Sequence, residues 1–151
     1  MALTRAQVET VLIKRCGQLM AQAELEITTA GSNSDLNDPI GYALRRIGLM
    51  PANISNISDS DFVLLNTDDL DKLFDIAELR TLKNIQGNLT MVDTTTGPLT
   101  EKLSQLGASL EKQITRVENK IAEEYGNNSV AFSGSASRED GYTTAASNGN
   151  V

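Results

Sequence analysis

The chain of 151 residues has room for one domain. Aromatic residues make up 4% and tryptophan is absent, so a core has to be built from Leu, Ile, Val and Ala, which favours helices packed on helices. The net charge of -7 argues against a general nucleic-acid binder, because such proteins present a basic face to the phosphates.

The first helix is predicted over residues 4–27. Thr4 is followed three residues later by Gln7, which fits a capping box at the start of a helix. Apolar residues then recur at spacings of three and four and form one stripe, as in an amphipathic helix. The stripe consists of Val8, Val11, Leu12, Cys16, Leu19, Ala23 and Ile27.

The second helix is predicted to begin at Asp38 as its N-cap, with Pro39 at the first helical position, where a missing N–H costs nothing. It stops at Gly48. Residues 52–58 are expected to be a loop and residues 59–65 a short helical turn. The apolar face consists of Ile40, Ala43, Leu44 and Ile47.

A third helix is predicted over residues 67–86, where Gly87 and Asn88 end it. Its first turn is rich in Asp, which complements the positive end of the helix dipole. The threonine-rich residues 89–97 read as a short strand or an extended connection, and we favour the connection. The expected buried positions are Leu70, Leu73, Phe74, Ala77, Leu82 and Ile85.

The last helix is predicted from Gly97-Pro98 to Tyr125, with Gly126 as its stop. At 1.5 Å per residue it would be about 42 Å long, which is long for so small a domain. Its apolar stripe either lies across its own bundle or also contacts a neighbouring subunit. That stripe consists of Leu99, Leu103, Leu106, Leu110, Ile114, Val117, Ile121 and Tyr125.

These elements predict an all-α fold: a small bundle of four or five helices with a long last helix, over residues 1–125, followed by an extended C-terminal tail, residues 126–151. In the tail, 19 of 26 residues are Gly, Ser, Asn, Thr or Ala, a composition that does not bury enough apolar surface to order itself. The buried set is expected to include Leu12, Leu19, Leu44, Ile47, Leu73, Phe74, Leu82, Leu103, Leu110 and Val117.

We expect the tail to dock on a partner as an extended segment. Phe132 and Tyr142 are its only aromatic residues and are predicted to be the anchors, with Val151 as a further apolar contact. Arg138 begins the short charged stretch between the anchors and is predicted to make a polar contact. The alternative is a mobile tail that is held only incidentally.

The sequence contains no histidine, so it offers no Ser-His or Cys-His pair for nucleophilic catalysis. With Cys16 as the single cysteine, no disulfide forms within the chain. The acidic residues between positions 59 and 78 lack the ligand spacing of an EF-hand and are read as helix caps and a solvated face. We therefore expect no enzyme, no cofactor and no metal.

Two basic pairs remain as candidates for function: Lys14-Arg15, midway along the first helix, and Arg45-Arg46. Arg45 and Arg46 fall in the last turn of the second helix. Their structural interpretation is complementation of the helix dipole. Their functional interpretation is an ion pair with an acidic neighbouring subunit, or a contact with passing DNA. Together with the tail residues they form the predicted partner-binding set.

Residues 35–49, DLNDPIGYALRRIGL, resemble the D-x-x-x-x-φ-x-x-A-L-R-x-φ-G pattern near the start of tailed-phage head-to-tail connector (adaptor) proteins. In that family a compact helical bundle forms a twelve-membered ring below the portal, and an extended terminus docks onto a neighbouring ring. The resemblance implies a structural adaptor in the neck of a virion, a ring homo-oligomer that contacts portal and tail or neck proteins, with DNA passing transiently through its channel.

Two other functions stay open: a DNA-binding or packaging accessory protein that uses Arg45 and Arg46, and a capsid decoration or scaffolding protein. No apolar run approaches the ~18 residues of a membrane span, and the first residues show no signal-peptide pattern. We therefore expect a soluble protein that is made in the host cytoplasm and contacts no membrane.

Overall fold

The computed structural model describes residues 2–92 and 99–126, and for residues 90–92 and 99–104 it describes the helical backbone alone. Within these ranges the chain is helical and has no strand, which confirms the predicted all-α class there. The predicted tail lies outside them from residue 127 onward. The elements are α1 (Arg5–Gln22), η1 (Ser34–Leu36), α2 (Asn37–Arg46), η2 (Asp59–Phe62), η3 (Thr67–Asp69), α3 (Leu70–Val92) and α4 (Leu99–Tyr125), where η marks a 3-10 helix.

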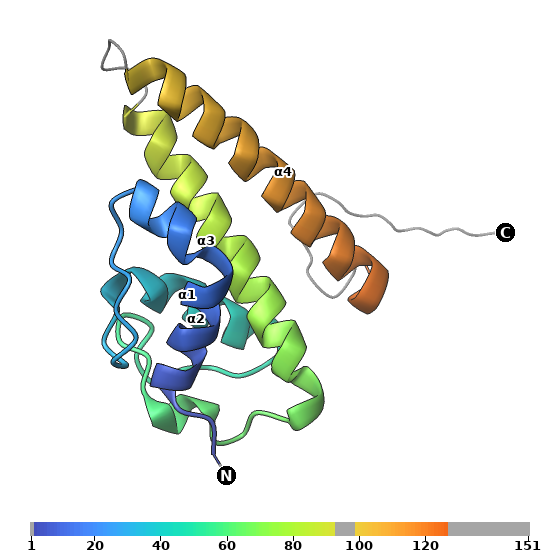
Figure 1. The fold of residues 1–151 in the computed structure, drawn as a ribbon. Coiled ribbons are helices and arrows are strands. Elements are labelled where there is room, and N and C mark those ends of the chain that lie inside the picture. The colour runs from blue at the N-terminus through green and yellow to red at the C-terminus, as the bar shows by residue number, and fades with distance from the viewer. Residues whose placement is uncertain (1, 93–98, 127–151) are drawn as a thin grey trace, which may run out of the picture.

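Helix α3 is the centre of the fold, because α1, α2 and α4 all pack against it. Figure 1 shows α1 and α2 on one side of α3 and α4 along the other side. Residues 73–79 of α3 are buried all the way round instead of along one stripe. The core on both sides is mainly aliphatic and includes Leu12, Met20, Ile40, Leu44, Leu73, Ile85, Leu110 and Ile121.

Three predicted helix ends are confirmed. Thr4 caps α1, and its hydroxyl and the Gln7 side chain form the capping box. Helix α2 is terminated by Gly48, whose φ of 96° favours glycine, and α4 ends at Tyr125 with Gly126 at a φ of 79°. The capping box and the two glycines act on neighbouring residues only, so these helix ends can be predicted from the sequence.

Helix α1 ends five residues earlier than predicted, at Gln22 instead of Ile27. Glu24 takes the left-handed conformation, with a φ of 61°, that glycine usually supplies after a helix. The amide of Leu25 then donates to the carbonyl of Met20 over 2.8 Å, which is the closing bond of a Schellman motif. Ile27 is consequently exposed instead of belonging to the apolar stripe.

Asp38 is not the N-cap of α2, because the helix begins two residues earlier than predicted, at Asn37, with Leu36 in the cap position. Pro39 is therefore the third helical residue instead of the first. The Asp38 carboxylate is directed to α3 instead, where it accepts hydrogen bonds from Arg80. A tertiary contact has replaced the capping role that the sequence predicts.

Helix α3 continues through Gly87 to Val92, so the predicted end at residue 86 is wrong, as is the extended structure expected for residues 89–92. A glycine inside a helix costs about 1 kcal/mol relative to alanine. Leu89, two residues further on, is partly buried against the core, and this packing offsets the cost of the glycine.

The apolar stripe of α4 faces α3 in its own chain, so over the described side chains it needs no neighbouring subunit to cover it. Leu110, Ile114, Val117 and Ile121 are buried, and Leu106 and Tyr125 are partly buried. Of the predicted core, Leu19 and Ile47 are only partly buried and pack at its edge, and the Leu103 side chain lies outside the described residues. The other seven are buried: Leu12, Leu44, Leu73, Phe74, Leu82, Leu110 and Val117.

Candidate functional site

The predicted partner-binding arginines lie in the last turn of α2, as expected. Arg45 is exposed, whereas the guanidinium of Arg46 lies 5.5 Å from the ring centroid of Tyr42. Arg80 of α3 lies 4.6 Å from the same ring. Tyr42 thus contacts two guanidinium groups in a cation–π arrangement, and Arg46 is held against its own helix.

Asp38 and Arg80 join α2 to α3 through a two-pronged ion pair. Arg80 Nε donates to Asp38 Oδ2 over 2.8 Å, and Arg80 Nη2 donates to Asp38 Oδ1 over 3.2 Å. Asn84 adds a third bond over 2.8 Å. The hydrogen bond from Arg80 is the largest cause that lowers the pKa of the Asp38 carboxyl. Arg80 is therefore already engaged and is not available to an external phosphate.

The remaining predicted site residues, Phe132, Arg138, Tyr142 and Val151, lie outside the described residues. Their expected docking role stays a prediction. The described part of the chain instead presents three features that the sequence interpretation missed: two buried charge clusters and one exposed apolar surface.

The first cluster lies where α1, α3 and α4 meet, around the buried carboxylates Asp75 and Glu78 of α3. Asp75 Oδ1 accepts hydrogen bonds from Arg15 Nη1 and Lys120 Nζ, both over 2.9 Å. Asp75 Oδ2 accepts from the Tyr125 hydroxyl over 2.9 Å, and Glu78 Oε1 accepts from Arg15 over 3.0 Å. These bonds join α1 and α4 to the central helix at the same carboxylate.

The cluster changes the chemistry of two neighbours. Burial is the largest cause that raises the pKa of Tyr125, and the hydrogen bond to Asp75 adds to it. Burial, followed by the negative charge of Glu78, raises the pKa of Cys16 to about 12. Both groups therefore stay protonated at neutral pH, which makes Cys16 an unreactive core residue.

Interpretation of the acidic residues as caps and a solvated face is correct for some of them and wrong for Asp75 and Glu78. Asp61 completes a capping box at the start of η2, and Asp59 accepts the backbone N–H of Arg5 over 2.7 Å. Asp75 is only 1% exposed and Glu78 7%. Across residues 2–92 and 99–126, no group of three or more His, Cys, Asp or Glu is placed to hold a metal ion.

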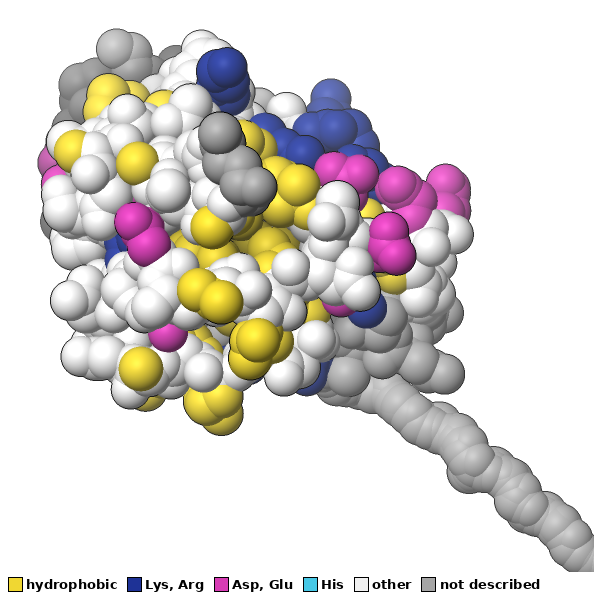
Figure 2. Space-filling model, turned by 90° about the horizontal axis from the view of Figure 1, so that it is seen from below, with side chains coloured by type: hydrophobic (Ala, Val, Ile, Leu, Met, Phe, Trp, Pro, Cys, Tyr) yellow, Lys and Arg dark blue, Asp and Glu magenta, His cyan; other side chains and the backbone are white. Residues whose placement is uncertain are grey.

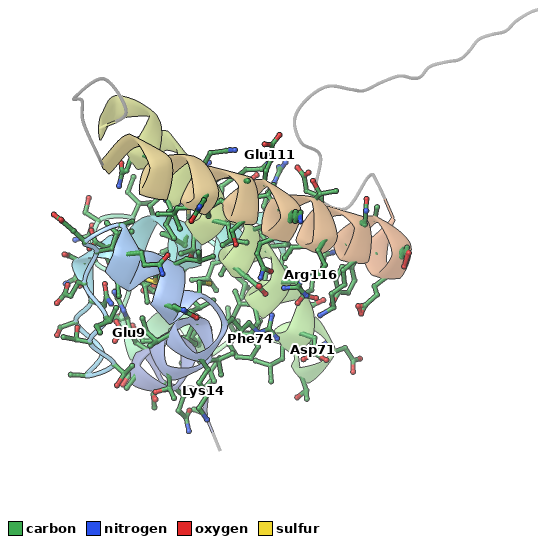
Figure 3. The ribbon with its side chains drawn as sticks, turned by 45° about the horizontal axis from the view of Figure 1, so that its top comes forward. Glu9, Lys14, Asp71, Phe74, Glu111 and Arg116 are labelled. Carbon is green, nitrogen blue, oxygen red and sulfur yellow. The ribbon has the colours of Figure 1, made fainter. Side chains whose placement is uncertain are left out.

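Four cations form a ridge beside this cluster: Arg15 of α1, with Lys112, Arg116 and Lys120 of α4. The α4 residues follow each other at spacings of four, so they lie along one face of the helix. Figure 3 shows Arg116 on the side of α4 that faces α1 and α3. The side chains of Arg116 and Lys120 are 63% and 44% exposed. We call this set the cationic ridge.

The second buried cluster joins Arg5 and Glu9, one turn apart on α1. Their side chains are 2% and 0% exposed, and Arg5 Nε lies 2.8 Å from Glu9 Oε2. The same guanidinium donates to the side-chain oxygen of Asn37 and to the carbonyl oxygens of Asn33 and Ile57. One side chain thus holds two loops against α1.

Glu9 completes this arrangement from the other side. Its Oε1 accepts the backbone N–H of Gly31 over 2.7 Å, and its Oε2 accepts that of Asn33 over 2.9 Å. The Asn33 amide donates in turn to the carbonyl oxygens of Glu26 and Thr28. Buried charges are stable when they are paired and hydrogen-bonded, so this network is a structural lock for the loops.

An exposed apolar surface lies at the end of the molecule that carries the N-terminus, η2 and η3 (Figure 1). Val63 and Leu64, between η2 and η3, are 66% and 81% exposed, and Met50 is 76% exposed. The amide of Ala52 donates to Asp61 over 3.0 Å, which holds the Met50 segment beside η2. Figure 2 shows apolar side chains spread over this face and lining a hollow in it.

Residues 47–69, which carry this surface, contain four aspartates and no lysine or arginine. We call the surface the loop face and define it by Met50, Ile54, Val63 and Leu64 with Asp59, Asp61, Asp68 and Asp69. The sequence did not distinguish its apolar members from core residues. In the run 62–65, Phe62 is buried and Leu65 partly buried, while the two residues between them point outward.

Among the described residues, no helix is long and apolar enough to cross a membrane. Comparison of the chain with protein-family models, with curated proteins and with solved structures finds no match.

Proposed function

We propose that this chain is a structural subunit of a tailed-phage virion, which assembles into a ring and joins the portal to the tail. The observation that carries the proposal is the loop face, where large aliphatic side chains stand in solvent. Contiguous exposed apolar surface is typical of protein–protein contact sites. The motif that resembles the connector family, residues 35–49, lies next to this surface in the chain.

The internal arrangement of the described residues supports an assembly role over a role in chemistry. Each described carboxylate that is buried is already satisfied by cations or backbone amides, as with Asp75 and Glu9. The apolar stripe of α4 is covered by α3. The exposed apolar side chains of the loop face are not covered within the described residues, and a bound partner would cover them.

The tail, residues 127–151, is proposed as the fastener to the partner ring. At ~3.3 Å per residue it spans up to about 80 Å, far more than the bundle's own radius. Phe132 and Tyr142 are the proposed anchors. Deletion of residues 127–151 is expected to leave the bundle folded by circular dichroism and to weaken binding to the portal ring; equal binding by the truncated chain would show that the tail is not the fastener.

The ring itself is tested by native mass spectrometry and negative-stain electron microscopy of the full-length chain. We expect a closed oligomer of defined size, alone or with portal added. A chain that stays monomeric in both conditions contradicts the proposal. Immunogold labelling of virions then separates a neck position from a capsid shell position, and a label on the shell would favour a decoration protein.

The rival function is DNA binding through Arg45 and Arg46. Its test is a mobility shift with duplex DNA at physiological salt, using the wild type and an Arg45→Ala/Arg46→Ala variant. We expect no shift for either protein, because Arg46 is packed on Tyr42 and the loop face is acidic. If the wild-type protein shifts the DNA and the double variant does not, the result would favour DNA binding over the adaptor function.

A further inference from the structure

We propose that the loop face of one copy docks on the cationic ridge of the next copy, and that this contact repeats around the ring. The inference deepens the proposed function and rests on it. The contact joins two different surfaces of the same chain, so it is a head-to-tail interface, the type that closes into rings.

The loop face supplies the apolar centre and the negative charge of this interface. Val63 and Leu64 are the most prominent of its exposed apolar side chains, apart from Met50. Asp68 and Asp69 follow four and five residues after Leu64, in η3, and residues 47–69 contain no basic residue. A partner for this surface must therefore be basic and must tolerate aliphatic side chains.

The cationic ridge meets the electrostatic requirement. Two of its four cations, Arg15 and Lys120, are already bonded to the buried carboxylates Asp75 and Glu78, so the cations left for an external anion are Lys112 and Arg116. Lys112 is exposed and has no ion pair within residues 2–92 and 99–126. Arg116 donates to the neutral side chain of Gln113 on its own helix and reaches Glu78 only at 3.9 Å, and its side chain is 63% exposed.

A second copy is the occupant that these observations favour, because the chain carries both halves of a complementary pair. The tail is a poorer match for the loop face, since its charged residues, Arg138, Glu139 and Asp140, sum to -1 (one positive, two negative). Opposite charges across an interface steer association and set the register, whereas the apolar side chains contribute the burial.

The test uses two charge-reversed variants of the full-length chain. One carries Asp68→Lys/Asp69→Lys on the loop face, and the other carries Lys112→Glu/Arg116→Glu on the ridge. Each is expected to weaken self-association at least about tenfold in sedimentation velocity, because like charges then face each other. Circular dichroism checks that each variant is folded, and Glu111→Lys, an exposed charge on the side of α4 away from α1 and α3 (Figure 3), is the control for a charge reversal outside both surfaces.

An equimolar mixture of the two variants is the decisive measurement. In alternating order, every reversed loop face meets a reversed ridge and every native loop face meets a native ridge, so the mixture is expected to assemble like the wild type. Failure of the mixture, or wild-type assembly by each variant alone, overturns the interface while leaving the ring proposal intact. A wild-type chain that never oligomerises overturns both.

Two further arms exclude other occupants. Deletion of residues 127–151 in each variant is expected to leave the reversal effects unchanged. If the deletion abolishes them, the loop face binds the tail instead of the ridge. If the ridge variant alone loses a wild-type mobility shift on duplex DNA, the ridge binds phosphates, and the inference is overturned.

Discussion

The Tyr125 hydroxyl donates a 2.9 Å hydrogen bond to Oδ2 of Asp75, which joins the last turn of α4 to the buried first half of α3. Lys120 reaches the other oxygen of the same carboxylate from one turn earlier. The outer helix is thus fixed to the central helix near its C-terminal end by polar bonds, in addition to the aliphatic stripe between them.

Tyr125→Phe is expected to change how stability depends on alkaline pH. The folded-state pKa of Tyr125 is raised, first by burial and then by Asp75, so its contribution is complete below the unfolded value of about 10 and is lost as pH rises above it. The free energy of unfolding in urea, measured between about pH 8 and 11, should fall more steeply for the wild type than for Tyr125→Phe. Parallel curves would contradict this assignment.

Asp75→Asn is expected to destabilise the fold by about 1–3 kcal/mol, because it removes the charge that Arg15 and Lys120 share. Both cations are partly exposed and regain water, which keeps the loss below that of a fully buried pair. Urea unfolding measures the effect. Asp38→Asn is the matched control on an exposed pair, where we expect at most about 1 kcal/mol.

Arg5→Met is expected to have a larger effect, about 3–5 kcal/mol, because it leaves the Glu9 carboxylate buried without its cation. Adding Glu9→Leu should recover only part of the loss, since the amides of Gly31 and Asn33 then have no acceptor. Denaturant unfolding of the three proteins checks this order. A double variant as stable as the wild type would show that the network is dispensable.

Local signals explain what the sequence could predict of the fold. The Thr4 capping box and the glycines after α2 and α4 act through their immediate neighbours, and all were found where expected. The end of α3 depended instead on packing: Gly87 and Asn88 read as a stop, but the helix continues to Val92, and Leu89 packs partly buried against the core. Tertiary contacts of this kind have no local sequence signal.

The two glycines of this comparison give opposite expected results. Gly87→Ala should stabilise the protein by about 0.5–1 kcal/mol, because the residue is helical and an added Cβ meets nothing within 4 Å. Gly48→Ala should destabilise it by about 1–2 kcal/mol, because a φ of 96° is strained for alanine. Thermal unfolding of both variants is the measurement, and shifts of the same sign would contradict the argument.

The candidate site was less predictable than the fold. Charge alone placed Asp75 and Glu78 with their solvated neighbours, although both belong to a run of seven consecutive buried residues of α3. Likewise, composition does not reveal that Val63 and Leu64 face outward, because the 3-10 helix that ends at the buried Phe62 is only four residues long. A sequence pattern assigns residues to a buried or exposed face only where the helix or strand is long enough for the pattern to repeat.

Cys16 is expected to react slowly with thiol reagents in the folded protein. At about pH 8 a thiol whose pKa is about 12 is ionised in roughly one molecule in ten thousand, and its side chain is also buried. Modification by a disulfide reagent, followed with increasing urea, should accelerate together with global unfolding. Fast labelling without denaturant would show that α1 opens locally.

The placement of α4 on the outside of the bundle has a consequence for motion. Within the described residues α4 packs on α3 and makes no comparable contact with α1 or α2, so its release leaves the other three helices in place. Its amide hydrogens should therefore exchange with deuterium before those of α1 and α3, at a free energy below that of global unfolding. Since the ridge lies mainly on α4, a neighbour bound there would slow this exchange, and the deuterium uptake of one helix becomes a direct report of assembly.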